Sequence, residues 1–123
     1  MENKKNDELL DHYQRTLGNV PDPISTLFNY DPVSLEGYTM MRKRIMKDPP
    51  DGALPIKYNE LIFVILDVVL DNLAGAKNHV RAAMKAGLTH DELVEALIQV
   101  MMVNGIASWG KVGYKVVDFA ATL

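Results

Sequence analysis

Apolar side chains recur along most of this chain at intervals of three and four residues, a spacing that gathers them on one face of a helix. We therefore expect an all-α fold. Gly18 and Gly87 mark helix ends, and Thr89 with Glu92 forms a capping box that begins a helix. The pattern predicts a bundle of six to seven helices, from segments near 6–17, a short stretch after Pro23, 31–47, 55–71, 73–86, 89–103 and 106–121.

The strongest break in this pattern is the segment Asp-Pro-Pro-Asp-Gly at 48–52. Proline and glycine interrupt helices, so this segment predicts a loop. We find no repeat, no low-complexity tract and no linker between domains. The chain is therefore expected to form a single domain over 1–123, with an N-terminal helical arm at 1–50 and a helical core at 51–123.

The helix expected at 55–71 is apolar on nearly all sides, because Leu61 to Leu70 form an almost continuous apolar run. A short run of this kind also suits a buried strand, but its length and helical surroundings favour a helix. A helix that is apolar all round needs cover on all sides, and a partner subunit is the expected cover. Asp67 interrupts the run, and we expect it to be paired in packing, with a basic side chain of another subunit as one choice.

Composition narrows the classes of protein further. The chain has 123 residues, a net charge of -3 and no cysteine, so disulfides, thiolate metal sites and thiol redox chemistry are excluded. The mixed charges argue against nucleic acid as a partner. The charged N-terminus does not resemble a signal peptide, and the longest apolar run is too short to span a bilayer. We expect a soluble, cytoplasmic protein with no membrane partner.

Glu60 and His79 are the candidate catalytic residues. A carboxylate beside an imidazole fixes the orientation of the ring, and such a pair can move a proton near neutral pH. If their helices form a hairpin near Asn72, the two residues are offset by about 6 Å along the helix axes. A bridging water or a crossing angle would close that gap. The alternatives are a hydrogen-bonded core histidine and an acid favoured by the helix dipole.

Three further residues are candidates for binding a substrate. Lys57 lies one turn before Glu60, and it or Arg81 is a candidate for holding a carboxylate. Trp109 is a candidate pocket residue, with core packing as the alternative. The three histidines are scattered, so we expect no metal site. A basic tract at 42–44 and Lys47 suits either a solvated helix face or a docking site for an anion.

The second half of the chain resembles the carboxymuconolactone decarboxylase family, which includes the alkylhydroperoxidase-D-like branch. The resemblance lies in the stretch Leu-Pro-Ile-Lys-Tyr-Asn-Glu-Leu-Ile from Leu54 and in the stretch from His79 to Ala96, and continues more weakly over 104–107. It implies an alkylhydroperoxidase-D-like helical bundle that assembles as a trimer or hexamer, with pockets near the subunit contacts.

The peroxidase branch of this family has a glutamate, then Cys-x-His-Cys, then a histidine. On this chain the glutamate falls on Glu60 and the last histidine on His79, while Asn72, Ala74 and Gly75 replace the middle motif. Without a thiolate, peroxide reduction of that kind is excluded. The chain is thus more similar to the decarboxylase branch.

The decarboxylase branch implies loss of carbon dioxide from a small carboxylated lactone or enolisable acid, with no metal or organic cofactor. His79 would supply the proton and Glu60 would orient it, with Lys57 or Arg81 holding the carboxylate of this anionic substrate. The alternative function is a non-catalytic helical oligomer that binds a small ligand or a partner protein.

Overall fold

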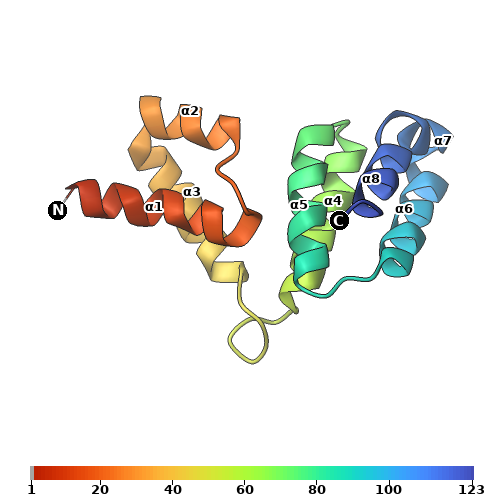
Figure 1. Cartoon of the computed structure of the whole chain (residues 1–123), viewed down its shortest axis with the longest axis horizontal. Coiled ribbons are helices and arrows are strands. Elements are labelled where there is room, and N and C mark those ends of the chain that lie inside the picture. Colours follow the sequence, from red (N-terminus) through yellow and green to blue (C-terminus); the bar gives the residue numbers. More distant parts are fainter. Residues whose placement is uncertain (1) are drawn as a thin grey trace. The chain divides into compact units, whose positions relative to one another are not determined.

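The computed structural model describes residues 2–123, with side chains from Lys4 onward, and all regular structure in this part of the chain is helical. The all-α prediction is therefore confirmed. Figure 1 shows the elements in chain order. They are α1 (Glu2–Leu17), α2 (Asp22–Tyr30), α3 (Pro32–Ile45), α4 (Ile56–Val69), α5 (Leu73–Lys85), α6 (His90–Asn104), α7 (Ile106–Ser108), the π-helix η1 (Trp109–Gly113) and α8 (Tyr114–Ala120).

The chain divides into two compact units between Leu54 and Pro55. This boundary follows the loop that the sequence predicts at 48–52. The prediction of a single domain with an arm and a core stays a prediction. In the first unit, α1 packs against α3 through buried apolar side chains, and the Tyr13 and Thr39 hydroxyl groups share a hydrogen bond of 2.6 Å.

The basic tract at the end of α3 is not wholly a solvated face. Lys43, Arg44 and Lys47 are exposed, but Arg42 is buried. Its guanidinium donates from Nε to His12 Nε2 at 3.4 Å and from Nη2 to Thr16 Oγ1 at 3.2 Å. Arg42 is thus a packing residue of the first unit, where its head group finds hydrogen-bond acceptors.

His12, which is only 4% exposed, gives the first unit a pH-dependent stability. Burial, followed by the charges of Arg42, Lys43 and Arg15, lowers the pKa of His12 from 6.5 to about 4. The unfolded chain therefore binds a proton at His12 between these two values and the folded chain does not. The stabilising contribution is complete above pH 6.5 and is lost as the pH falls through about 4.

We expect the free energy of unfolding to fall between pH 6.5 and 4 because of this group, by on the order of 2 kcal/mol after allowance for solvent screening. Urea unfolding at a series of pH values, in the wild type and in His12→Gln, measures the effect. The glutamine variant should have the flatter dependence, and equal slopes would contradict the assignment.

The second unit is built around a hairpin of α4 and α5, which lie side by side in Figure 1, with α6 and the α7–η1–α8 segment packed against it. Ala76, Val80 and Ala83 form a buried stripe along one face of α5. The capping box of Thr89 and Glu92 is present at the start of α6. The segment 106–120 is helical throughout, with the π turn in its middle.

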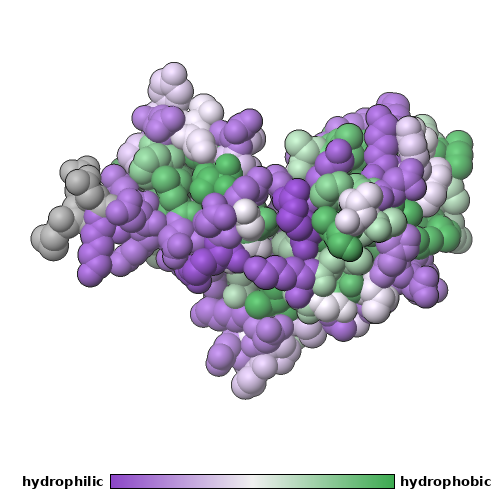
Figure 2. Space-filling model, viewed as in Figure 1, coloured by the Kyte–Doolittle hydropathy of each residue, from purple (hydrophilic) through white to green (hydrophobic). Residues whose placement is uncertain are grey.

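Helix α4 buries one face and exposes another in the single chain. Its buried face contains Glu60, Val64 and Val68, whereas Tyr58, Ile62, Leu66 and Val69 are exposed. Further apolar side chains reach the surface of this unit near α6 and α7, as Figure 2 shows. The partner subunit that would cover α4, and the trimer or hexamer, stay predictions. Among the described helices, none is both long and apolar enough to cross a membrane.

Candidate functional site

The site lies where α4 and α5 face each other, and the turn between them sets their register. Asn72 is the N-cap of α5, and its side-chain oxygen accepts a hydrogen bond of 3.2 Å from the Gly75 backbone. The Asn72 backbone amide donates to the carbonyl of Asp67 at 2.8 Å. Such a tight connection makes the two helices neighbours. As a result, the His79 ring, two turns into α5, meets the side chains of α4.

Glu60 and His79 are in direct contact. The carboxylate Oε2 of Glu60 accepts a hydrogen bond of 2.7 Å from His79 Nδ1. Glu60 is fully buried, and the His79 side chain is 15% exposed. The sequence leaves open whether a water joins them, and the structure shows that the helix packing closes the expected offset. A carboxylate only accepts, so Nδ1 carries the proton and Nε2 is the nitrogen available for chemistry.

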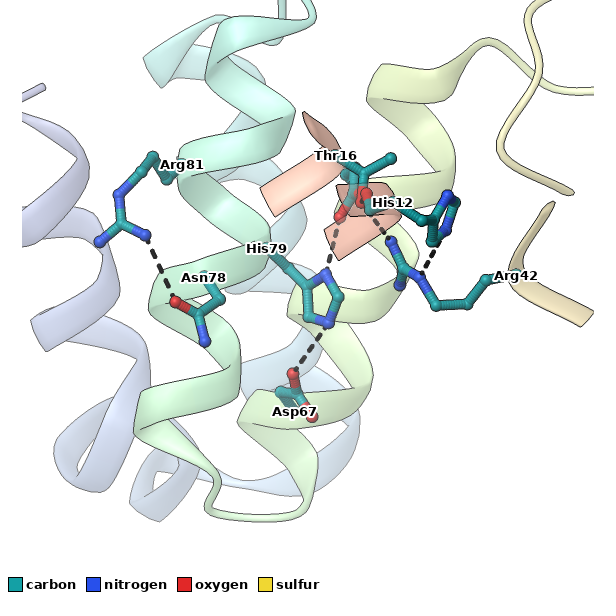
Figure 3. A network of polar contacts seen from close by, with 8 residues as sticks. His12, Thr16, Arg42, Asp67, Asn78, His79 and Arg81 are labelled. Atoms are coloured by element: carbon teal, nitrogen blue, oxygen red, sulfur yellow. Dashed lines mark hydrogen bonds and ion pairs between the residues drawn. The ribbon is translucent and has the colours of Figure 1, made fainter. Parts of the chain in front are cut away.

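Asp67 is the site residue whose importance sequence reasoning misses. Its Oδ2 lies 3.9 Å from His79 Nε2 (Figure 3), whereas Glu60 bonds to the other ring nitrogen. Within the chain its partner is therefore a histidine, and a basic partner from another subunit stays a prediction. The signal was present in the spacing, because Glu60 and Asp67 are seven residues apart and so share one face of α4.

The phenyl ring of Phe63 covers the imidazole. The two ring centroids are 4.7 Å apart, and the planes are inclined by 30°. Phe63 comes one turn after Glu60 on α4, so the same helix face supplies the acid and the ring. An offset aromatic contact of this kind limits rotation of the imidazole. The His79 ring is thus held by a carboxylate at one nitrogen and by an apolar surface over its plane.

Asp67 has an unusual electrostatic environment for an aspartate. Burial raises the pKa of its carboxyl, while the nearby His79 ring and a hydrogen bond from Asn72 lower that pKa. The donor is Asn72 Nδ2, 3.3 Å from Asp67 Oδ1. Because the effect of burial exceeds the other two, Asp67 holds a proton more readily than an exposed aspartate. The site therefore places a carboxyl that can carry a proton beside the available nitrogen of His79.

Comparisons with known proteins agree with this architecture. The sequence profile of the carboxymuconolactone decarboxylase family matches residues 32–112, a range that contains Glu60, Asp67 and His79. The chain belongs to the carboxymuconolactone decarboxylase family. The family resemblance inferred from the sequence is thereby confirmed.

A solved structure supports the same assignment for nearly the whole chain. A protein of Burkholderia xenovorans LB400, assigned as a carboxymuconolactone decarboxylase and solved at 1.65 Å, is 40% identical to this family member. The match has a TM-score of 0.88 and covers 95% of this chain and 92% of that one. Because the match covers nearly the whole chain, the family fold includes α1 and α2, which lie before the residues that the profile matches. Among curated proteins, none matches the chain.

In this member of the carboxymuconolactone decarboxylase family, the three predicted substrate-binding residues have other partners. The Lys57 ammonium lies over the Tyr58 ring, 5.0 Å from its centroid. Arg81 donates to Asn78 Oδ1 at 3.3 Å and lies over the Phe119 ring. Trp109 packs against the apolar core. The structure thus joins Glu60 to His79 but does not bring these three residues to the pair.

Arg81 in particular points away from His79, since the two lie on different sides of α5 (Figure 3). It lines a hollow of about 360 Å³ together with Met84, Lys85 and Leu123. Residues two positions apart on a helix diverge by about 200°, so the sequence separation explains the difference. We therefore leave Arg81 out of the proposed site within one chain.

No group of three histidine, aspartate or glutamate side chains in the described part of the chain is arranged to hold a metal ion. The three side chains of the site instead form a row, in which His79 lies between two carboxylates. This row is suited to moving a proton along its length. The expectation of no metal and no cofactor stays an expectation.

Proposed function

We propose that this chain is a cofactor-free decarboxylase, or a related proton-transfer enzyme, that acts on a small carboxylated lactone or enolisable acid. The observation that carries the proposal is the 2.7 Å hydrogen bond between the buried Glu60 carboxylate and His79 Nδ1. That bond leaves Nε2 directed toward the partly exposed edge of the site. An oriented imidazole is a common proton donor and acceptor near neutral pH.

The proposed reaction requires a proton at one defined step. The bond between the substrate carbon and its carboxylate breaks, carbon dioxide leaves, and the electron pair stays on the carbon as an enolate. A new carbon–hydrogen bond then forms with the proton of His79 Nε2, which leaves the ring neutral. Glu60 is a positioning residue in this scheme, because it holds Nδ1 and so presents Nε2 to the carbon.

The contacts of His79 also bear on the alternative function, a non-catalytic oligomer. A histidine that only fills a core usually bonds to backbone groups, since these are the commonest partners of buried side chains. Both ring nitrogens of His79 instead face carboxylates. Two acids around one ring are costly to bury without a functional gain, which favours the enzyme.

Thiol peroxidase activity is outside this proposal. The chain has no cysteine, and in the sequence resemblance Asn72 and Gly75 stand where the peroxidase branch has its thiols. No side chain here can form the sulfenic acid on which that reaction depends.

The experiment that tests the proposal is a decarboxylation screen. Purified protein is incubated with a panel of β-keto acids and carboxylated lactones, and carbon dioxide release is measured against His79→Asn protein at equal concentration. We expect at least one acid to be decarboxylated by the wild type above the variant. If the two proteins give the same release for every acid in the panel, the proposed function is wrong.

A further inference from the structure

The proposed reaction gives roles to His79 and Glu60, but none to Asp67, the second acid of the site. Its side chain is 18% exposed, slightly more than that of His79, so one end of the row reaches solvent. Glu60, at the other end, is fully buried. The row Glu60–His79–Asp67 therefore has a buried end at Glu60 and a partly exposed end at Asp67, where a proton can be exchanged with solvent.

The position of Asp67 is supported by its neighbours. Asn72 Nδ2 donates to Oδ1, which leaves Oδ2 as the oxygen that faces His79 Nε2. Gly75 gives this arrangement its room, because a Cβ there would lie 2.6 Å from Asp67 Oδ2 and 2.5 Å from Asn72 Nδ2. An alanine is ordinarily the better residue inside a helix. Glycine at this position thus keeps the carboxyl in place.

We propose that Asp67 is the proton relay between His79 Nε2 and solvent, with Asn72 and Gly75 fixing the relay in position. This inference rests on the proposed function for its catalytic consequence, although the relay itself does not require a substrate. The gap of 3.9 Å is too long for a hydrogen bond, so transfer passes through one bridging water or a small side-chain rotation.

The proton balance of a catalytic cycle defines what the relay does. After His79 gives the Nε2 proton to the substrate carbon, the ring is neutral and Nε2 is empty. The Asp67 carboxyl then releases its proton to Nε2 and becomes a carboxylate. A proton from water restores the carboxyl at its exposed oxygen. Over one turnover, one proton passes from solvent to carbon, and Glu60 keeps its bond to Nδ1 throughout.

In the described part of the chain, the Asp67 carboxyl has two polar side chains beside it. His79 faces it from α5, and the Asn72 amide holds it from the turn. Asp71, in the turn that follows α4, pairs with Lys111 of η1 at 3.7 Å and is about half exposed. Asp71→Asn is therefore a matched control, because it removes a nearby carboxylate that is not part of the row.

The relay is tested first without a substrate, by nuclear magnetic resonance on ¹⁵N-labelled protein. At a pH where the His79 ring carries a proton on both nitrogens, the rate at which its Nε2 proton exchanges with water is measured in the wild type, Asp67→Asn and Asp71→Asn. The asparagine at 67 keeps an oxygen for Asn72 but cannot release a proton. We expect exchange to slow about tenfold or more in Asp67→Asn only. Unchanged exchange in Asp67→Asn, or equal slowing in Asp71→Asn, would overturn the relay.

The catalytic consequence is tested with the panel acid that gives the highest carbon dioxide release. Asp67→Asn should lower kcat by about 10- to 100-fold, leave KM within about twofold, and remove one limb of the pH profile of kcat. Gly75→Ala, which displaces the carboxyl without removing it, should lower kcat in the same direction. If the wild type is active and Asp67→Asn keeps its kcat and pH profile, the relay is wrong. If no acid is turned over but exchange slows as expected, the relay stands and the proposed function fails.

Discussion

His79→Asn is expected to abolish nearly all decarboxylation by this chain. Asparagine is polar and smaller than histidine, so it fits the partly exposed position on α5, but its amide neither gives up nor takes a proton near neutral pH. Proton transfer by a positioned side chain contributes about 10²- to 10⁴-fold to a rate. We therefore expect kcat to fall by that factor, with a much smaller change in KM.

The matched control for this variant is His90→Asn. His90 lies on α6 of the same unit, and its Nε2 contacts the carbonyl of Val117 at 3.0 Å, away from the Glu60–His79 pair. Its replacement tests the effect of losing a partly buried histidine without touching the site. Steady-state carbon dioxide release measures both variants. A His79→Asn protein that keeps the wild-type kcat would remove the histidine from the mechanism.

Glu60→Gln is expected to have the second largest effect, although it changes only one atom of a buried side chain. The carboxylate accepts from His79 Nδ1, so it permits only the ring form in which Nδ1 carries the proton. An amide can either accept from that nitrogen or donate to it, and it therefore no longer selects the ring form. Loss of a carboxylate that orients a catalytic histidine lowers kcat by about 10²-fold or more, up to about 10⁴-fold.

Glu60→Leu separates this orienting role from packing. Leucine fills a similar volume in the buried position but offers no hydrogen bond, so His79 Nδ1 loses its acceptor. We expect both variants to lose activity, and the leucine variant also to unfold at a lower urea concentration than the wild type, because the partly buried Nδ1–H of His79 is left without an acceptor. A glutamine variant with full activity would show that the charge of Glu60 has no part in the reaction.

Much of the fold follows from local patterns in the sequence. The Thr89 capping box depends on spacing within one helix, and it is present as predicted. The N-terminal helix begins at Glu2, earlier than the residue 6 that the pattern indicates. Charged residues such as lysine and glutamate favour helix without adding an apolar period, which is why the pattern missed this first turn.

The candidate site was predictable only in part, since its geometry depends on how two helices cross. Glu60 and His79 could be chosen from their types and from the family resemblance, but the 2.7 Å contact requires the α4–α5 packing. For Asp67 the sequence indicates only a packing role, because one acid in an apolar run has no visible partner in the sequence. The charge of Arg81 alone suggests a place near the substrate, whereas its position on α5 directs its side chain toward Phe119.

The central claim is that Glu60 holds His79 by Nδ1 and so frees Nε2 to move a proton. The most direct measurement is the ¹⁵N–¹H correlation spectrum of the His79 ring in the wild-type protein, recorded at a pH where the ring is neutral. We predict that Nδ1 carries the proton and that Nε2 does not. A neutral His79 with its proton on Nε2 would contradict this account, since the carboxylate of Glu60 could then not be the acceptor that orients the ring.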